Sequence, residues 1–273
     1  MKITVNERRV EVDPGTRLDD VRARFKPDAD IAIYNGAAMR EDRSLSDGDR
    51  VVLIRRGERP GSEEMEALLA ARHSPGVHQR VKGAAVGIAG LGGLGSAVAI
   101  ALARTGIGRL VLADFDIVEP SNLNRQQYFV DQLGMPKTEA LQANLARINP
   151  YVRVEVHAVR LDPSNVAALF GDVDVLVEAF DTPEAKAMLM ESFLVRFPGK
   201  SLVMATGLAG YESSNSIRTT RVGKNLYVVG DLVTAAEPGR GLMAPRVGVA
   251  AHHQANTVLR ILMGADPVEE GTI

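Results

Sequence analysis

A glycine-rich segment at positions 90–96, with the sequence GLGGLGS, constrains the fold of this chain more than any other feature. Residues 84–89 before it are small and β-branched, which is typical of a strand buried on both faces of a parallel sheet. Residues 97–104 after it have the composition of a helix. Glycines between such elements let a phosphate approach the backbone N–H groups at the helix start. The segment therefore predicts an α/β nucleotide-binding domain.

A second predicted strand, residues 109–113, ends at Asp114. This carboxylate follows the glycines by about 20 residues, the spacing at which an acid accepts hydrogen bonds from the ribose of a bound nucleotide. On these residues alone, an NAD-dependent Rossmann oxidoreductase is the default interpretation.

The loop after Asp114 favours a different chemistry. It carries Asp116, Ser121, Asn122 and Arg125 at the carboxyl edge of the sheet, where open α/β sheets bind ligands. Hydride transfer has no use for that set. Displacement of phosphates does, because Arg125 can offset charge that develops on a triphosphate and Asn122 can donate to its oxygens. A solvated loop capped by Asp and Asn is the plainer alternative.

Two further polar residues lie at predicted helix starts. Pro136 suits a first helical turn, so Lys137 stands at a helix N-terminus, where the dipole disfavours a cation and an anionic partner would stabilise it. A solvated lysine is the alternative. Asp181 follows a predicted strand at residues 173–180 and could cap the helix that begins at Pro183.

Taken in order, these motifs resemble the ubiquitin-activating-enzyme superfamily, in particular the bacterial sulfur-carrier adenylyltransferases of the ThiF and MoeB type. The resemblance covers about residues 72–264. Its motifs are the glycine turn, Asp-Phe-Asp at 114–116, Ser-Asn-Leu-x-Arg-Gln at 121–126, Gly-Met-Pro-Lys at 134–137, and Asp181. The short, cysteine-free chain looks most like the compact ThiF subfamily of thiamine (thiazole) biosynthesis.

The resemblance implies a nucleotidyltransferase that uses ATP and Mg²⁺. The C-terminal glycine carboxylate of a ubiquitin-like sulfur carrier protein would attack the α-phosphate of ATP. The family also implies a homodimer, in which an arginine matched loosely by Arg72 enters the partner's site. The catalytic residues carried over are Arg72, Arg125, Lys137 and Asp181, with Asp181 as the magnesium ligand. The nucleotide-binding residues carried over are Gly90, Gly92, Gly93, Gly95, Asp114, Asp116, Ser121, Asn122, Arg125 and Lys137.

Composition limits the classes of partner and cofactor that we expect this chain to bind. With 273 residues, a net charge of −2 and a pI near 6.2, the chain has no electrostatic footprint for nucleic acid or an anionic membrane. It has no apolar signal segment and no run of about 18 apolar residues, so we expect a cytoplasmic protein. The absence of cysteine excludes cysteine-based zinc sites and covalent sulfur intermediates. Adenylation is therefore carried over from the family, without zinc and without sulfur transfer.

Residues 1–58 predict a separate domain. Strands at 2–5 and 9–13, a helix capped by Thr16 and strands at 31–34 and 50–54 resemble the β-grasp fold of ThiS and ubiquitin. The last strand runs into the chain without a Gly-Gly terminus, so this domain cannot be adenylated without cleavage. We expect a degenerate carrier with a structural, regulatory or docking role, or an appended domain that does not touch the active cleft.

The remainder of the chain completes the predicted architecture. Residues 59–71 form a linker and helix, and residues 72–273 form the ATP-binding domain. Its Rossmann-like doubly wound sheet is expected to gain extra strands at 211–220 and 225–229. Two alternative functions stay open: an NAD-dependent oxidoreductase, and a nucleotide-binding regulatory module without activity.

Overall fold

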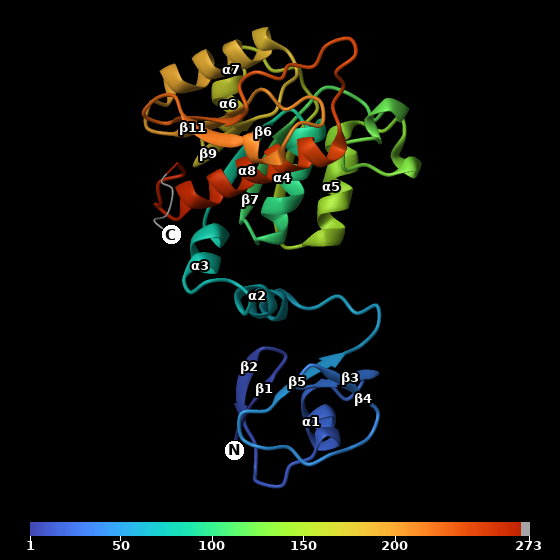
Figure 1. Ribbon diagram of the computed structural model, residues 1–273. Coiled ribbons are helices and arrows are strands. Elements are labelled where there is room, and N and C mark those ends of the chain that lie inside the picture. Colours follow the sequence, from blue (N-terminus) through green and yellow to red (C-terminus); the bar gives the residue numbers. More distant parts are fainter. Residues whose placement is uncertain (269–273) are drawn as a thin grey trace. The chain divides into compact units, whose positions relative to one another are not determined.

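The structure is a computed structural model that describes residues 1–268. The chain divides into two compact units, Met1–Gly76 and Val77–Ile273 (Figure 1). Both units combine helices with a sheet, and the predicted α/β class is confirmed for the chain.

The first unit has a β-grasp sheet with the strand order β2-β1-β5-β3-β4, in which β1 and β5 are parallel. Its strands are β1 (Lys2–Val5), β2 (Arg8–Glu11), β3 (Ile31–Tyr34), β4 (Ala37–Met39) and β5 (Arg50–Ile54). Helix α1 (Leu18–Phe25) buries Leu18 and Val21 against Val51 and Leu53. This core confirms the predicted ubiquitin-like fold.

Two local expectations in this unit are wrong. The short strand β4 was not predicted, because it has only three residues and pairs with β3 across the Tyr34–Ala37 turn. Thr16 does not cap α1, since its hydroxyl donates to the Asp13 carbonyl at 2.7 Å. Arg17 holds the cap position, and its N–H donates to Asp20 at 2.9 Å.

Helix α2 (Ser62–Ala70) belongs to the first unit and is held there by polar contacts. Asn6 donates to Glu64 at 3.0 Å. Lys26 lies 2.6 Å from Glu58 and 3.5 Å from Glu64. The segment that follows β5 is thus tied to its own domain.

The second unit has a seven-stranded sheet with the order β11-β12-β10-β9-β6-β7-β8, in which only β11 is antiparallel to its neighbour. The strands are β6 (Ala85–Ala89), β7 (Arg109–Ala113), β8 (Arg153–His157), β9 (Val175–Glu178), β10 (Ser201–Ala205), β11 (Arg218–Arg221) and β12 (Leu226–Gly230). This is the predicted Rossmann-like sheet with additional strands.

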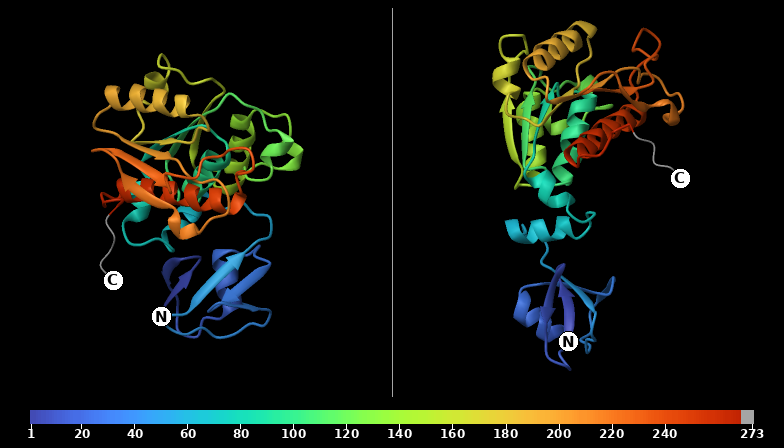
Figure 2. Two further views of the ribbon diagram at one scale, coloured as in Figure 1. Left: turned by 45° about the horizontal axis from the view of Figure 1, so that its top comes forward. Right: turned by 90° about the vertical axis from the view of Figure 1, so that its left-hand side faces the viewer.

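Helices cover both faces of this sheet (Figure 2). The helices of this unit are α3 (Val77–Lys82), α4 (Gly93–Arg104), α5 (Lys137–Ile148), α6 (Val166–Phe170), α7 (Pro183–Arg196) and α8 (Ala244–Leu262). Helix α4 packs between α5 and α8 on one face, and α6 packs on α7 on the other. Two apolar cores result, one around Val98 and Leu141 and one around Phe170 and Phe193.

The strand order places a ligand crevice next to the glycine segment. From central β6 the chain runs outward through β7 and β8, then returns to β9 on the other side of β6. The carboxyl ends of β6 and β9 therefore flank the point where the winding reverses, which is where such sheets bind ligands.

The predicted strand at 211–220 is mostly wrong. Only Arg218–Arg221 is a strand, and the preceding residues form a loop with the 3-10 turn Ser214–Ser216. A buried arginine, Arg246, holds this loop through its carbonyl groups. In residues 1–268 we find no helix with the length and apolar character needed to cross a lipid bilayer.

Candidate active site

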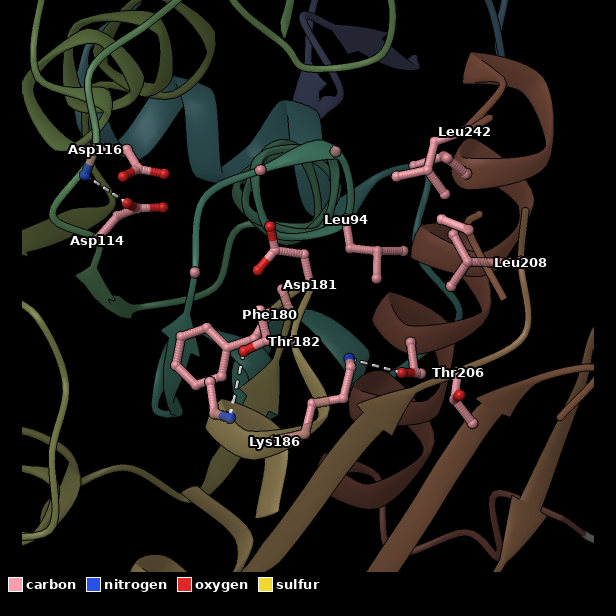
Figure 3. Close-up of a pocket in the computed structure, with 18 of the residues that line it drawn as sticks. Leu94, Asp114, Asp116, Phe180, Asp181, Thr182, Lys186, Thr206, Leu208 and Leu242 are labelled. Carbon is pink, nitrogen blue, oxygen red and sulfur yellow. Dashed lines mark hydrogen bonds between the residues drawn. The ribbon is translucent and has the colours of Figure 1, made fainter. Parts of the chain in front are cut away.

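A cavity of about 690 Å³ opens at the carboxyl ends of β6, β7, β9 and β10. The residues that directly follow these strands line it (Figure 3). Asp114 and Asp116 lie on one side of the cavity, and Leu208 and Leu242 lie on the opposite side. The cavity thus has an acidic side, next to the glycine turn, and an apolar side.

The four glycines of the turn meet different surroundings. A Cβ on Gly95 would lie 1.9 Å from the Gly90 carbonyl oxygen, and one on Gly90 would lie 2.8 Å from the Ala179 carbonyl oxygen. These two glycines allow α4 and β9 to pack closely on the turn. Gly92 is open, since the nearest atom to its Cβ position is 3.8 Å away. Gly92 and Gly93 line the cavity at the N-terminus of α4, where N–H groups favour an anion.

Asp114 ties the glycine turn to the next strand end. Its Oδ2 accepts from the Leu91 N–H at 2.6 Å, and its Oδ1 accepts from the Asp116 N–H at 2.8 Å. Burial raises the pKa of the Asp114 carboxyl above its ordinary value, although these N–H donors and the charge of Lys137 act against that rise. Each oxygen keeps acceptor capacity for a ribose hydroxyl.

Lys137 begins α5 and is 6% exposed. Its Nζ lies 2.9 Å from Asp116 Oδ2, and its N–H donates to the Asp116 carbonyl at 2.9 Å. The lysine is therefore no solvated surface residue, and Asp116 is an anionic partner at this helix start. Both residues line the cavity.

Arg125 also lines the cavity, whereas Ser121 and Asn122 do not. The Arg125 side chain donates to the Ser121 carbonyl at 3.2 Å and to Asn124 at 2.8 Å. Asn122 is buried in the 3-10 turn Pro120–Asn122, and its Oδ1 accepts from the Glu119 N–H at 3.1 Å. In this structure, Ser121 and Asn122 shape the loop that presents the guanidinium.

Asp181 projects into the cavity from the loop after β9 (Figure 3). It does not cap α7. That role belongs to Thr182, whose hydroxyl oxygen accepts from the Ala185 N–H at 3.4 Å. Within residues 1–268, the Asp181 carboxylate has no hydrogen-bond partner, so it is available to a ligand.

A buried ion pair underlies the Asp181 loop and was not predicted from the sequence. Lys186 Nζ donates to Glu178 at 2.8 and 3.0 Å and to the Ala205 carbonyl at 2.9 Å. Burial raises the pKa of the Glu178 carboxyl, and the charge of Lys186 opposes that rise. The pair joins the ends of β9 and β10 to the first turns of α7. The only signal in the sequence was a lysine one turn after Pro183.

A cation–π contact on the acidic side of the cavity was also not predicted. The guanidinium of Arg160 lies 4.0 Å from the centroid of the Phe115 ring. Both residues line the cavity together with Leu161. The contact offers a flat surface to a planar ligand group. Residues 159–161 follow the carboxyl end of β8, which is the signal that could have identified them.

The chain matches two protein-family models. The ThiF family model covers residues 66–272, and the ThiS-like ubiquitin model covers residues 1–57. The chain belongs to the ThiF family. The predicted resemblance is confirmed for both parts of the chain.

Named proteins of known sequence are similar to this ThiF-family chain. It is 32% identical over 192 residues to the adenylyltransferase and sulfurtransferase UBA4 of Candida glabrata. The aligned residues make up 68% of this chain and 44% of that protein. It is 32% identical over 202 residues to the molybdopterin-synthase adenylyltransferase of Escherichia coli, which is 71% of this chain and 79% of that protein. The chain therefore spans less than half of the fungal relative.

Solved structures extend the similarity to three dimensions. E. coli tRNA N6-threonylcarbamoyladenosine dehydratase, TcdA, solved in complex with ATP, superimposes with a TM-score of 0.66 at 26% identity. The match covers 72% of this chain and 92% of that chain. E. coli MccB with ATP gives a TM-score of 0.54 at 26% identity and covers 70% of this chain and 59% of that chain.

One residue carried over from the ThiF family lies outside this unit. Arg72 follows α2 in the first unit, Met1–Gly76. Its side chain is largely exposed, and its guanidinium lies 3.9 Å from Glu7. All the residues that line the cavity belong to the second unit.

Proposed function

We propose that this chain uses ATP to adenylate the C-terminal glycine carboxylate of a ubiquitin-like sulfur carrier protein. One observation carries the proposal: Arg125, Lys137 and Asp181 line one cavity beside the glycine turn. The adenylyltransferase names of the relatives and the ATP in neighbouring structures support it. Thiazole synthesis for thiamine, or related sulfur transfer, is the pathway we propose.

The nucleotide would lie across the acidic side of the cavity. Its phosphates would meet the open turn at Gly92 and the N-terminus of α4, with Arg125 and Lys137 as cations. Asp114 would accept from the ribose. The adenine base would lie against Phe115 and Arg160, which form the cation–π contact.

The reaction is a displacement at phosphorus. A carboxylate oxygen of the carrier forms a bond to the α-phosphorus, the bond from that phosphorus to the bridging oxygen breaks, and pyrophosphate leaves. The nucleophile is already ionised, so the site needs no general base. Orientation of the two reactants and charge stabilisation by Arg125 and Lys137 would supply most of the rate.

Asp181 is the side chain that we propose as a ligand for Mg²⁺. It is a hard oxygen donor without a protein partner in residues 1–268, and Mg²⁺ sites often combine one or two carboxylates with substrate phosphates. The same residues contain no cluster of three or more potential protein ligands, so the phosphates would have to supply the rest. The ion would neutralise charge on the triphosphate.

We also propose a homodimer in which Arg72 acts on the partner's cavity. Its side chain is 74% exposed, and its guanidinium lies 3.9 Å from the Glu7 carboxylate. Mixed dimers of Arg72→Ala and Asp181→Ala should then regain part of the activity that each variant lacks alone. Verified mixed dimers without recovery would remove Arg72 from the site.

ATP–pyrophosphate exchange with candidate carriers tests the proposed function. Exchange should require a carrier with an intact glycine terminus. Arg125→Ala should slow it by roughly 10²–10³-fold, by analogy with loss of an oxyanion donor. Arg196→Ala, an exposed arginine at the end of α7, is the matched control and should leave the rate unchanged.

Two alternative functions would give different results in nucleotide-binding and exchange assays. An NAD-dependent oxidoreductase would bind NAD and ignore ATP in calorimetric titrations. A regulatory module would bind ATP without carrier-dependent exchange. Either result would overturn the adenylyltransferase proposal.

A further inference from the structure

The buried Arg246 is the centre of a polar cluster outside the cavity. Arg246 lies in the first turn of α8 and is 4% exposed. Its Nη1 donates to the carbonyl oxygens of Glu212 and Ser213 at 2.9 and 2.8 Å. Its Nη2 donates to Ser216 Oγ at 3.1 Å and to Asp231 Oδ2 at 2.6 Å. The arginine therefore joins a loop, the end of β12 and the start of α8.

Asp231 connects this cluster to the wall of the cavity. Its Oδ1 accepts from the N–H groups of Val233 and Thr234 at 2.9 and 2.8 Å, and its Oδ2 accepts from the Thr234 hydroxyl at 2.7 Å. The Thr234 carbonyl accepts from the N–H groups of Leu208 and Ala209 at 3.0 and 3.2 Å. Leu208, Ala209 and Thr234 line the cavity. A continuous set of hydrogen bonds thus runs from the arginine to two wall segments.

The wall held in this way consists mostly of small residues. These are Thr206, Gly207, Ala209, Thr234, Ala235 and Ala236. Gly207 has a φ of +74°, and a Cβ there would lie 2.2 Å from Asp231 Oδ1. Only glycine permits this approach, which sets Asp231 directly against the wall's backbone. Small side chains leave room beside the wall for an extended main chain.

We infer that Asp231 and Arg246 are positioning residues that hold this wall in the shape that admits the carboxylate-bearing tail of the protein substrate. The inference deepens the proposed function and rests on it. Leu208 lies across the cavity from Asp114, the residue to which the nucleotide's ribose is assigned (Figure 3). Asp231 and Arg246 therefore shape the part of the cavity that would receive the carrier's carboxylate, opposite the part assigned to the nucleotide.

Neither side chain is suited to touch the reacting atoms. Arg246 is not among the residues that line the cavity, and the donors on both of its Nη atoms serve protein acceptors. Asp231 is likewise outside the lining, with both oxygens occupied by protein donors. Their effect must pass through the backbone of residues 207–209 and 234–236.

Arg246→Lys tests the inference in the full chain, because lysine keeps the charge but cannot reproduce the forked set of hydrogen bonds. The carrier KM in pyrophosphate exchange should rise by roughly 10-fold or more, while the ATP Kd stays within about twofold, since a change in substrate binding alone appears in KM. Asp231→Asn should act in the same direction. Arg221→Lys is the matched control, because Arg221 pairs with Asp266 at 2.7 Å on the surface of the same sheet.

Hydrogen exchange at residues 207–209 and 234–236 gives a second readout that needs no carrier. Exchange there should be faster in Arg246→Lys than in Arg221→Lys. Three results would each overturn the inference: unchanged hydrogen exchange in these residues, an unchanged carrier KM, or a loss of ATP affinity as large as the rise in carrier KM. If the wild-type chain shows no carrier-dependent reaction, the proposed function fails, and faster wall exchange in the variant would still support the positioning role.

Discussion

Lys137 Nζ and Asp116 Oδ2 lie 2.9 Å apart, yet the lysine side chain is 7% exposed and the aspartate side chain is 48% exposed. A buried cation is thus held at the edge of the cavity by a carboxylate that solvent reaches. The α5 N-terminus alone would disfavour the lysine, and Asp116 removes that conflict. A phosphate that enters the cavity would share the lysine with Asp116.

Lys137→Ala should weaken ATP binding by about 10- to 100-fold, the range expected for loss of a hydrogen bond to a charged group. Calorimetric titration measures the change. Lys224→Ala removes an exposed lysine that is not part of the cavity and should leave ATP affinity unaltered. Equal affinities of Lys137→Ala and wild type would exclude a phosphate contact.

Asp181→Asn should raise the Mg²⁺ concentration needed for half-maximal exchange by roughly 10-fold or more, because Mg²⁺ sites depend on carboxylate ligands. The measurement is a magnesium titration of the exchange rate at saturating ATP. Glu184→Gln changes an exposed acid in the first turn of α7 and serves as the control. An unchanged magnesium requirement in Asp181→Asn would assign the ion to other ligands.

The glycine turn allows a matched pair of substitutions. Gly95→Ala places a Cβ 1.9 Å from the Gly90 carbonyl oxygen, so we expect a loss of about 1–3 kcal/mol in the free energy of unfolding from overpacking. Gly92→Ala meets its nearest atom at 3.8 Å and has a negative φ, so it should fold normally and lose ATP affinity instead. Urea unfolding and calorimetry separate the two effects. A reversed pattern would mean that Gly95, not Gly92, faces the ligand.

The parts of the fold that local pattern determines were predictable. The strand before Gly90, the helix after it and Asp114 at the next strand end follow from hydrophobic runs and glycine placement. The same reasoning singled out Arg125, Lys137 and Asp181, and the family resemblance added the magnesium role of Asp181. The sequence offered Asp181 as a possible cap of α7, and the structure gives that role to the adjacent Thr182. Sequence position alone cannot decide which of two adjacent oxygens turns back to the helix.

Contacts between distant segments were not predictable. Phe115 meets Arg160 because the sheet brings the ends of β7 and β8 to one edge. Arg246 meets Asp231 because the start of α8 lies next to the end of β12. The strand prediction at 211–220 failed for the same reason, since most of this segment is a loop. Its local sequence does not reveal that the distant, buried Arg246 binds the carbonyl groups of Glu212 and Ser213.

The acid dependence of stability should report on Asp231. Burial acts to raise the pKa of its carboxyl, but hydrogen bonds from the Thr234 and Val233 N–H groups and the Thr234 hydroxyl outweigh it, so the pKa lies below its ordinary value. The native state then binds a proton less tightly than the unfolded state. The stabilisation is complete above the unfolded pKa of about 3.9 and is lost as the pH falls through the lower native value.

Asp231→Asn should therefore be less stable than wild type at pH 7, and the difference should narrow below about pH 4. Urea unfolding at a series of pH values measures it. Asp131→Asn, an exposed acid in the 3-10 turn Val130–Gln132, should differ from wild type by no more than about 0.5 kcal/mol at pH 7. A difference for Asp231→Asn that grows in acid would contradict the assigned direction.

The first unit can be tested by two deletions with different boundaries. Deleting residues 1–58 leaves α2 without Asn6 and Lys26, its polar partners in the β-grasp domain. Deleting residues 1–76 removes the whole unit. The second unit has its own cores and all the residues that line the cavity, so the longer deletion should fold and bind ATP within about twofold of wild type.

The carrier KM of the longer deletion then reports the role of the degenerate carrier domain. A lower KM means that the tethered domain competes with the carrier, which a short linker favours through a high effective concentration. Loss of carrier-dependent exchange in both deletions, with ATP binding intact, means that the domain is a docking platform. Loss in the longer deletion alone reflects the removal of Arg72. The shorter deletion is the control for the loss of partners of α2. A change seen only in the shorter deletion comes from the exposed helix α2, not from the absence of the β-grasp domain. Equal KM and equal stability in both deletions would leave the domain without a part in the reaction.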